Sequence, residues 1–206
     1  MFYNFVIRFV HFLLLILNGR IHAQNKEKLP EGTTYVLAAP HRSWLDPVFI
    51  AIAAYPHRYT TMAKKELFDN KFVNFLLRKM NAFPVDRANP GPSAIKHPVS
   101  VLKEGNLNFF IFSTGTRYDA AVKGGTTTIA RMAKVPIVPV VFQGPFTFKD
   151  LLKRQKAVVR FGDIIQIPEG RVPREKMAEI DLELEQSFAR LDKEINPDFV
   201  HEFKKK

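Results

Sequence analysis

The stretch Pro40-His41-Arg42-Ser43-Trp44-Leu45-Asp46-Pro47 joins two apolar segments of different character. The short apolar run before it, Thr34 to Ala39, predicts a buried strand. The run after it, Val48 to Ala54, permits a helix. Asp46-Pro47 is a typical helix start, because a carboxylate can cap the first free N–H groups and proline fits the first helical turn. The pattern therefore predicts a strand, a loop that carries His41, and a helix.

Such a loop can bring the carboxylate of Asp46 to one imidazole nitrogen of His41 and leave the other nitrogen facing a cleft. An imidazole held in one tautomer by an acid is what a general base requires. The alternative is a loop histidine that lies beside a helix cap and has no chemical role. The spacing alone does not separate these two interpretations, so the neighbouring segments decide between them.

The composition limits the classes of protein that the chain can belong to. Its 206 residues fit one domain with a substantial core. The formal net charge of +11 predicts an anionic partner: a nucleic acid, an acidic lipid or a phosphorylated substrate. The chain has no cysteine, which excludes disulfides, a thiolate nucleophile and a cysteine-ligated metal site.

The N-terminal segment Phe2 to Leu17 is dense in Phe, Val, Leu and Ile. It is shorter than the roughly 20 apolar residues that a membrane-spanning helix needs, and Arg8 interrupts it. We expect a helix that lies in one leaflet, with the basic stretch from Arg20 to Lys28 at the lipid headgroups. The alternative is an amphipathic helix packed on the protein's own core. Residues 1–30 are thus expected to form a membrane-associating helix with its connector, and residues 31–206 the catalytic domain.

Predicted strands and helices alternate through the rest of the chain. Further strands are expected at Tyr59–Ala63, Leu107–Phe112, Val135–Val141 and Val158–Ile167, and helices at 72–80, 94–103, 126–134 and 174–194. We place Ser93 as the cap of the second of these helices. The two prolines of the Val135–Val141 segment favour a strand end or a sheet edge. This alternation predicts an α/β domain with a mostly parallel sheet flanked by helices, and a site at the carboxyl ends of the strands.

Four blocks between residues 35 and 168 occur in the order that is typical of one family. They are His41 with Asp46 (histidine, four residues, aspartate), Phe83-Pro84-Val85-Asp86-Arg87, Phe112-Ser113-Thr114-Gly115-Thr116-Arg117, and Val135 to Val140. Lys64-Lys65-Glu66-Leu67 and Lys123-Gly124-Gly125 also match. By these blocks the sequence resembles the glycerolipid acyltransferases, and among them the bacterial 1-acyl-sn-glycerol-3-phosphate acyltransferases.

The resemblance implies transfer of a fatty acyl group from a thioester to the sn-2 hydroxyl of 1-acyl-sn-glycerol 3-phosphate. In this interpretation His41 removes the hydroxyl proton and Asp46 orients the ring. The donor is acyl-CoA or acyl carrier protein, and neither a metal nor another cofactor is expected. The implied partners are lysophosphatidic acid and a membrane surface with anionic lipids, but no nucleic acid. The implied location is the cytosolic face of a bacterial cytoplasmic membrane.

The acceptor's phosphate requires fixed cations near the histidine. Arg87 and Arg117 are the first candidates, because a guanidinium can bind phosphate oxygens through two parallel hydrogen bonds. Lys64 and Lys123 are further candidates. The backbone at Gly115 and Thr116 can offer additional N–H groups to a phosphate.

The sequence departs from the family pattern at Ser113-Thr114, where the family usually has Pro-Glu. Threonine can form a hydrogen bond but has no charge, so the local field is expected to be more positive. An inactive relative is therefore one alternative.

Other functions compete with this one. An acyltransferase that acts on another lysolipid or on glycerol 3-phosphate keeps the same chemistry. A basic membrane-surface or nucleic-acid-binding module accounts for the charge, although the phenylalanines lie in runs that are expected to be buried rather than on a stacking platform. A serine hydrolase lacks its Gly-x-Ser-x-Gly elbow, and Ser43 is expected to be a hydrogen-bonding loop residue.

Overall fold

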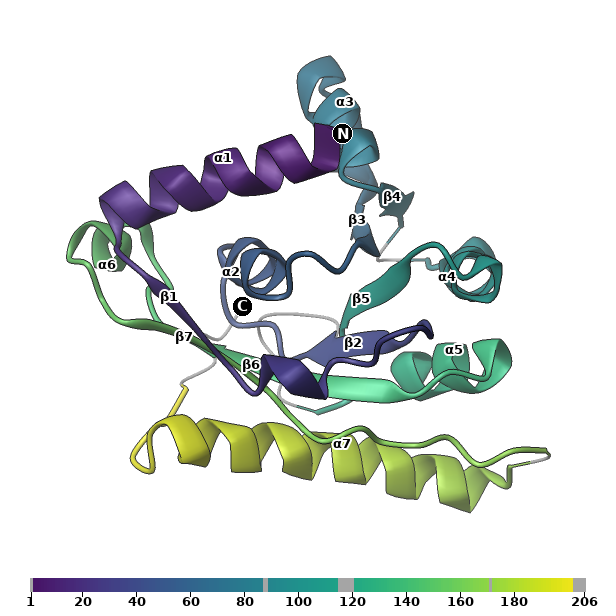
Figure 1. Ribbon diagram of the computed structural model, residues 1–206. Coiled ribbons are helices and arrows are strands. Elements are labelled where there is room, and N and C mark those ends of the chain that lie inside the picture. Colours follow the sequence, from purple (N-terminus) through teal and green to yellow (C-terminus); the bar gives the residue numbers. More distant parts are fainter. Residues whose placement is uncertain (1, 87–88, 115–120, 171, 202–206) are drawn as a thin grey trace.

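A seven-stranded sheet, covered by helices on both faces, forms the centre of the chain (Figure 1). The structure, a computed structural model, describes residues 2–86, 89–114, 121–170 and 172–201. The strands are β1 Ile21–Gln24, β2 Val36–Ala39, β3 Tyr59–Lys64, β4 Ala82–Val85, β5 Asn108–Phe112, β6 Ile137–Gln143 and β7 Ala157–Phe161. The helices are α1 Phe2–Leu17, α2 Asp46–Ala53, α3 Lys71–Lys79, α4 Ser93–Glu104, α5 Gly125–Ala133, α6 Phe148–Leu152 and α7 Arg174–Ile195. Two short 3₁₀ helices lie at Lys26–Lys28 and Lys65–Phe68.

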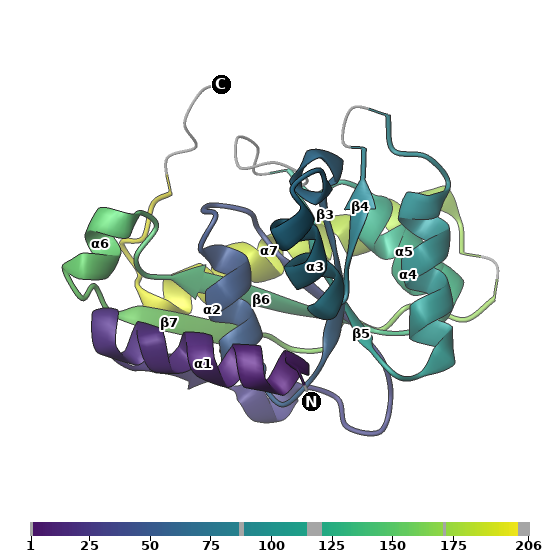
Figure 2. The same ribbon diagram turned by 90° about the horizontal axis from the view of Figure 1, so that it is seen from above.

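The strand order is β1-β7-β6-β2-β5-β3-β4. β2 pairs in parallel with both β5 and β6, and β3 pairs in parallel with β5 and β4. Only β7 and the edge strand β1 run the other way, since β7 pairs antiparallel with β6 and β1 pairs in parallel with β7. The predicted single α/β domain with a mostly parallel sheet is confirmed. The carboxyl ends of the parallel strands meet at one edge, toward which β3 and β4 point in Figure 2.

The two faces of the sheet bury separate apolar clusters. One cluster, under α1 and α2, contains Leu37, Phe49 and Phe110. The other, against α4, α5 and α7, contains Val36 and Phe109. Neighbouring strand residues therefore pack into opposite clusters, as alternating side chains require. Because both faces are covered, all four residues of β2 are buried, which explains its unbroken apolar sequence.

The predicted N-terminal helix is present as α1 and lies across the top of the molecule (Figure 1). One stripe of α1, with Tyr3, Ile7 and Leu14, is buried in the cluster over α2. Its outer stripe exposes phenylalanine, leucine and isoleucine side chains. Core packing and an exposed apolar surface therefore occur on the same helix. In the described part of the chain, no helix is long and apolar enough to cross a membrane.

Both edge strands were absent from the sequence-based prediction. β1 lies within the stretch expected to be a basic connector, and two of its four residues are exposed. β4 contains Pro84, which the edge position tolerates because one side of the strand has no ladder to complete. β1 has a mixed sequence, and β4 is only four residues long and contains a proline, so neither was identified as a strand. The five-residue helix α6 was not predicted either. The expectation that Ser93 caps a helix is wrong, because Ser93 is the first residue of α4, Pro92 is the cap residue, and no side-chain cap bond forms.

The expectation that the prolines of the Val135–Val141 segment mark a strand end or a sheet edge is wrong for Pro139. Strand β6 lies between β2 and β7, and Pro139 pairs with Ala38 of β2. On the β7 side, regular pairing begins only at Val140, and the Gly162 N–H donates to the Pro139 carbonyl at 2.8 Å. The predicted strand 158–167 is accordingly interrupted after Phe161. This interruption lies beside the residue that has no N–H to donate.

Candidate active site

At the carboxyl edge of the sheet, His41 lies on the loop between β2 and α2, and Asp46 is the first residue of α2. The Nδ1 atom of His41 is 3.1 Å from Oδ2 of Asp46. The two residues are 7% and 1% exposed. The contact expected from the spacing is therefore present. A carboxylate at Nδ1 favours the tautomer with the proton on that nitrogen, which leaves Nε2 as an acceptor.

Asp46 also holds the loop on which His41 lies. Its Oδ2 atom accepts hydrogen bonds from the backbone N–H groups of Arg42, at 2.6 Å, and Ser43, at 2.7 Å. The expectation that Asp46 caps α2 is wrong, because Leu45 is the cap residue and no side-chain cap bond forms. As the first residue of the helix, Asp46 directs its side chain back toward the loop. One oxygen thus orients the ring and fixes the backbone around it.

The end of β5 supports the imidazole. The ring of His41 stacks on Phe112, with centroids 4.0 Å apart and an interplanar angle of 20°. The backbone N–H of His41 donates to Oγ1 of Thr114 at 3.2 Å. Thr114, which replaces the usual glutamate of the family pattern, is fully buried. Its hydroxyl therefore positions the histidine backbone.

Arg42 ties the same loop to the last turns of α7. Its guanidinium forms a two-pronged ion pair with the carboxylate of Asp192, with Nη1 2.9 Å from Oδ1. The side chains are 7% and 11% exposed. Gln143 donates to the Asp192 carboxylate and to its backbone carbonyl, both at 2.9 Å. This buried network joins the loop, β6 and α7, which are distant in sequence.

The segment after α7 returns over this network. The guanidinium of Arg42 lies 5.1 Å from the ring centroid of Phe199, and the ring of His201 lies 5.3 Å from that of Phe146. Burial and then the charge of Arg42 lower the pKa of His201. His201 is therefore neutral at neutral pH and adds no second positive charge beside Arg42.

Ser43 has the structural role expected of it. Its Oγ donates to the Phe146 carbonyl at 2.6 Å and accepts from the Leu45 N–H at 3.1 Å. A serine nucleophile needs its proton directed at a base. The proton of Ser43 is instead used to hold the loop.

A cavity of about 690 Å³ opens beside Phe112 and Ser113. Apolar side chains of β3, β5, α4 and α5 form most of its wall, and Lys123 also lines it. The backbone of Lys123 is held at the end of β5, since its N–H donates to the Ser113 carbonyl at 2.8 Å. The space thus combines an apolar wall with a cation at the edge where His41 lies.

Of the other predicted phosphate ligands, the structure describes only Lys64. Lys64 ends β3, is exposed and lies 3.4 Å from Glu66. Arg87, Gly115, Thr116 and Arg117 lie outside the described residues. In the described part of the chain, His41 and Asp46 are in contact, and Lys123 is joined through its backbone to Ser113, in a cavity whose lining does not include His41.

Sequence reasoning missed the parts played by Arg42 and Asp192. A signal for Asp192 was present, because it occupies the apolar stripe of α7 next to Leu191 and four residues after Phe188. A carboxylate on such a stripe requires a buried cationic partner. Among the described residues, no group of three or more His, Asp or Glu side chains could hold a metal ion.

Comparison with known protein families agrees with this fold and this loop. Residues 20–143 match the Acyltransferase protein family. Because the match covers more than half of the chain, the chain belongs to the acyltransferase family. The resemblance drawn from the four sequence blocks is confirmed.

Particular relatives narrow the comparison. The chain is 41% identical to the 1-acyl-sn-glycerol-3-phosphate acyltransferase of Streptococcus pneumoniae, over 94% of this chain and 74% of that protein. It is 39% identical to the enzyme of the same name from Bacillus subtilis, over 89% of this chain and 94% of that protein. The crystal structure of the 1-acyl-sn-glycerophosphate (LPA) acyltransferase PlsC from Thermotoga maritima matches with a TM-score of 0.69 at 21% identity. That match covers 92% of this chain and 79% of the other, and it supports the fold.

Proposed function

We propose that the protein transfers a fatty acyl group from an acyl thioester to the sn-2 hydroxyl of 1-acyl-sn-glycerol 3-phosphate, giving phosphatidic acid. The observation that carries the proposal is the 3.1 Å contact between His41 and Asp46 in a chain of the acyltransferase family. The names of the two bacterial relatives at 41% and 39% identity indicate the acceptor substrate. The donor is acyl-CoA or acyl carrier protein.

The chemistry follows from the Nε2 atom of His41, the ring nitrogen that Asp46 does not contact. As the acceptor oxygen attacks the thioester carbonyl, Nε2 takes the hydroxyl proton. The tetrahedral intermediate then collapses, the carbon–sulfur bond breaks, and the imidazolium returns its proton to the thiolate. The histidine is neutral again after each cycle. A thioester is already activated, so no acyl-enzyme is required.

Asp46 acts on the charge that forms during the reaction. The carboxylate stabilises the imidazolium while it fixes the tautomer. Its other two hydrogen bonds, to the Arg42 and Ser43 N–H groups, hold the loop before substrate arrives. The ring is therefore in position without reorganisation, which is how enzymes lower the free energy of a transition state.

The acceptor's phosphate is assigned to cations around the same edge. Arg87 and Arg117 bind it through paired hydrogen bonds, helped by the backbone at Gly115 and Thr116. Lys123, which lines the cavity beside Ser113, adds a further cation, and Lys64 does so at the end of β3. The apolar wall of the cavity suits an acyl chain.

Attachment to the membrane is assigned to α1. Its outer stripe of exposed apolar side chains suits the boundary between headgroups and acyl chains. The proposed location is the cytosolic face of the bacterial cytoplasmic membrane, where a lysolipid acceptor in the leaflet and a soluble donor meet.

Incubation of purified protein in detergent with lysophosphatidic acid and either donor tests the activity. We expect phosphatidic acid, identified by mass spectrometry, and release of free thiol in equal amount. Parallel reactions with glycerol 3-phosphate and with lysophosphatidylcholine define the acceptor. Product from one of these, with none from lysophosphatidic acid, would assign a different substrate.

Replacing Asp46 with asparagine is expected to lower kcat by about 10²-fold and to change the KM for lysophosphatidic acid little. The amide oxygen can still accept hydrogen bonds from the loop, so the fold is retained while the negative charge beside His41 is lost. Steady-state kinetics, with circular dichroism to verify folding, measure both effects. A folded Asp46→Asn protein with the wild-type kcat would remove this carboxylate from the mechanism.

A further inference from the structure

Large apolar side chains are exposed on three separate helices at one side of the molecule. On α3, Phe72 is 73% exposed, and on α6, Phe148 is 55% exposed. Together with the outer stripe of α1 they form what we call the apolar face: Phe5, Phe9, Phe12, Ile16, Phe72 and Phe148. Soluble proteins seldom expose so many large apolar side chains together, and such patches mark interaction surfaces.

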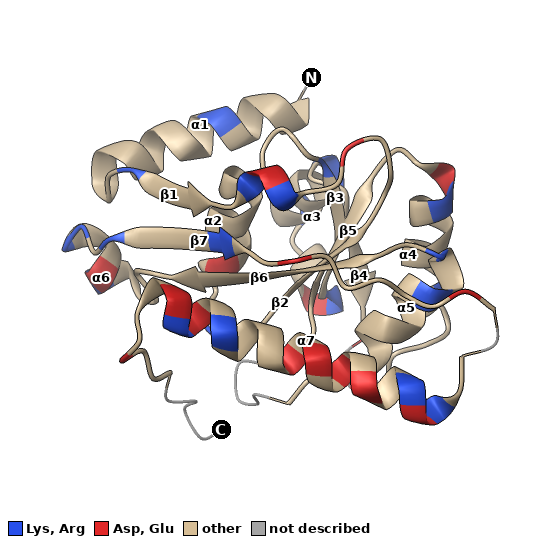
Figure 3. Cartoon of the chain, turned by 60° about the horizontal axis from the view of Figure 1, so that its bottom comes forward, with Lys and Arg blue, Asp and Glu red and all other residues tan. Residues whose placement is uncertain are grey.

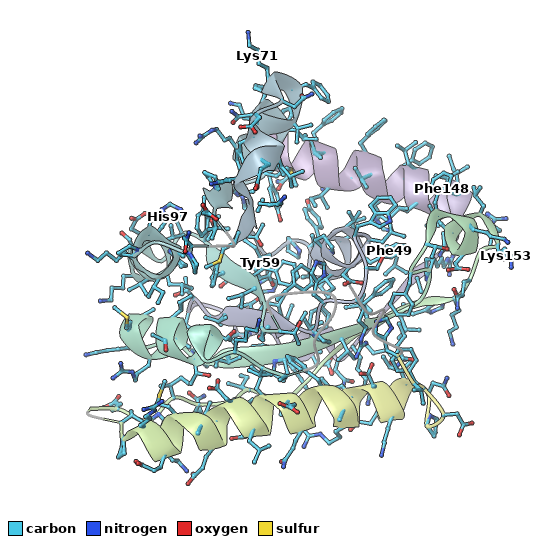
Figure 4. The ribbon with its side chains drawn as sticks, turned by 180° about the vertical axis from the view of Figure 1, so that it is seen from behind. Phe49, Tyr59, Lys71, His97, Phe148 and Lys153 are labelled. Atoms are coloured by element: carbon cyan, nitrogen blue, oxygen red, sulfur yellow. The ribbon has the colours of Figure 1, made fainter. Side chains whose placement is uncertain are left out.

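Direct contacts make the apolar face continuous. At the start of α1, Phe2 meets Phe75 of α3 edge to face, with ring centroids 5.8 Å apart. At the other end, Arg154, just after α6, donates to the Ile16 carbonyl at 3.0 Å. Figure 4 shows Lys71 at the tip of α3 and Phe148 on α6 at opposite ends of α1. The helix α1 is therefore the middle of a longer surface, with α3 and α6 as its two ends.

The charges at the two ends of this surface are mostly positive. Helix α3 carries Lys71, Arg78 and Lys79 and no acidic residue. Near α6, Lys149, Lys153 and Arg154 outnumber the single Asp150. On the opposite side of the sheet, α7 carries seven acidic and four basic residues (Figure 3). The molecule thus presents cations beside the apolar face and an excess of carboxylates away from it.

We propose that the whole apolar face, and not α1 alone, docks on a bilayer that contains anionic lipid. Phe72 and Phe148 enter the boundary between headgroups and acyl chains at either end of α1, and the neighbouring lysines and arginines bind the headgroups. A second copy of the chain fits this surface poorly, because two such faces in contact would oppose cations with cations. The inference extends the attachment proposed for α1 and does not depend on the reaction.

The test is partitioning of the full chain onto vesicles, measured by co-sedimentation. Two membranes are used: phosphatidylcholine alone, and an equimolar mixture with phosphatidylglycerol. The variants are Phe72→Ser, Phe148→Ser and, for α1, Phe5→Ser. Leu182→Ser is the matched control, since Leu182 is 54% exposed on α7 at the far side. Thermal unfolding verifies that each variant is folded.

We expect each phenylalanine substitution to weaken binding about tenfold, as loss of partial burial of one large side chain predicts. Leu182→Ser should bind like the wild type. The variants Lys71→Ala and Lys153→Ala should each weaken binding to the anionic vesicles about fivefold and leave binding to phosphatidylcholine unchanged.

Three results would overturn the proposal. If Phe5→Ser weakens binding while Phe72→Ser and Phe148→Ser do not, α1 alone contacts lipid. If light scattering without lipid shows a dimer that Phe72→Ser dissociates, the apolar face binds a second copy of the chain and not a bilayer. If the wild type does not bind either kind of vesicle, the face has another partner. None of these outcomes affects acyl transfer in detergent. Failure of the docking proposal can therefore be distinguished from failure of the proposed enzymatic activity.

Discussion

Replacement of His41 by alanine is expected to lower acyl transfer to lysophosphatidic acid by about 10²–10⁴-fold, the usual contribution of a general base. The loss should appear in kcat, because the phosphate and the acyl chain of the acceptor bind elsewhere. His41 is nearly buried and stacks on Phe112, so the variant also leaves a small void beside that ring.

Two measurements separate chemistry from folding in this variant. Circular dichroism and thermal unfolding report whether the His41→Ala protein is folded. His41→Gln serves as a second variant, since it retains a polar side chain of similar reach but cannot act as a base near neutral pH. Should either folded variant turn over at a rate near that of the wild type, His41 is not the base.

Asp192→Ala is expected to lower the free energy of unfolding by about 3–5 kcal/mol, because it leaves the buried Arg42 guanidinium without its counter-charge. Both partners of this pair are largely buried, so solvent compensates little. Gln143 loses a hydrogen-bond acceptor as well. Chemical denaturation followed by circular dichroism gives the difference.

The matched control for this experiment is Asp163→Ala. Asp163 forms ion pairs with Lys28 and Arg190, but its side chain is 70% exposed. Exposed ion pairs contribute at most about 1 kcal/mol. Equal small losses for Asp163→Ala and Asp192→Ala would show that the pair on Arg42 does not hold the loop. We also expect folded Asp192→Ala to lose kcat, since the loop before Asp46 is no longer tied to α7.

Most of the correctly predicted features, both strands and the contact in the site, were predicted from local sequence patterns. Strand β5 was evident from its four consecutive apolar residues, Phe109 to Phe112, and β2 from an unbroken apolar run, which it has because both of its faces are covered. The approach of His41 to Asp46 was predictable because only four residues separate them and a helix start fixes the position of Asp46. Each of these inferences needs only neighbouring residues.

Pairings between distant segments were not predictable. Arg42 and Asp192 are 150 residues apart, and nothing near either one indicates which partner it meets. Strand β1 is short and half exposed, and it acquires its structure only by pairing with β7. Pro139 is tolerated inside the sheet because the neighbouring strand is interrupted beside it, a compensation that lies more than twenty residues away.

The same limit applies to α1. Its sequence was consistent with both a core helix and an interfacial helix, and the three-dimensional packing shows one stripe buried and one exposed. The extension of that exposed stripe onto α3 and α6 depends on contacts such as that between Phe2 and Phe75. Periodicity within a single helix contains no information on such contacts.

The intact mass of the wild-type protein, measured after rapid quenching with an acyl thioester and no acceptor, tests the mechanism most directly. If His41 acts as a base on the acceptor hydroxyl, the mass stays unchanged, and phosphatidic acid forms only when lysophosphatidic acid is added. A mass increase of one acyl group, located on Ser43 or His41 and consumed when the acceptor arrives, would contradict direct transfer.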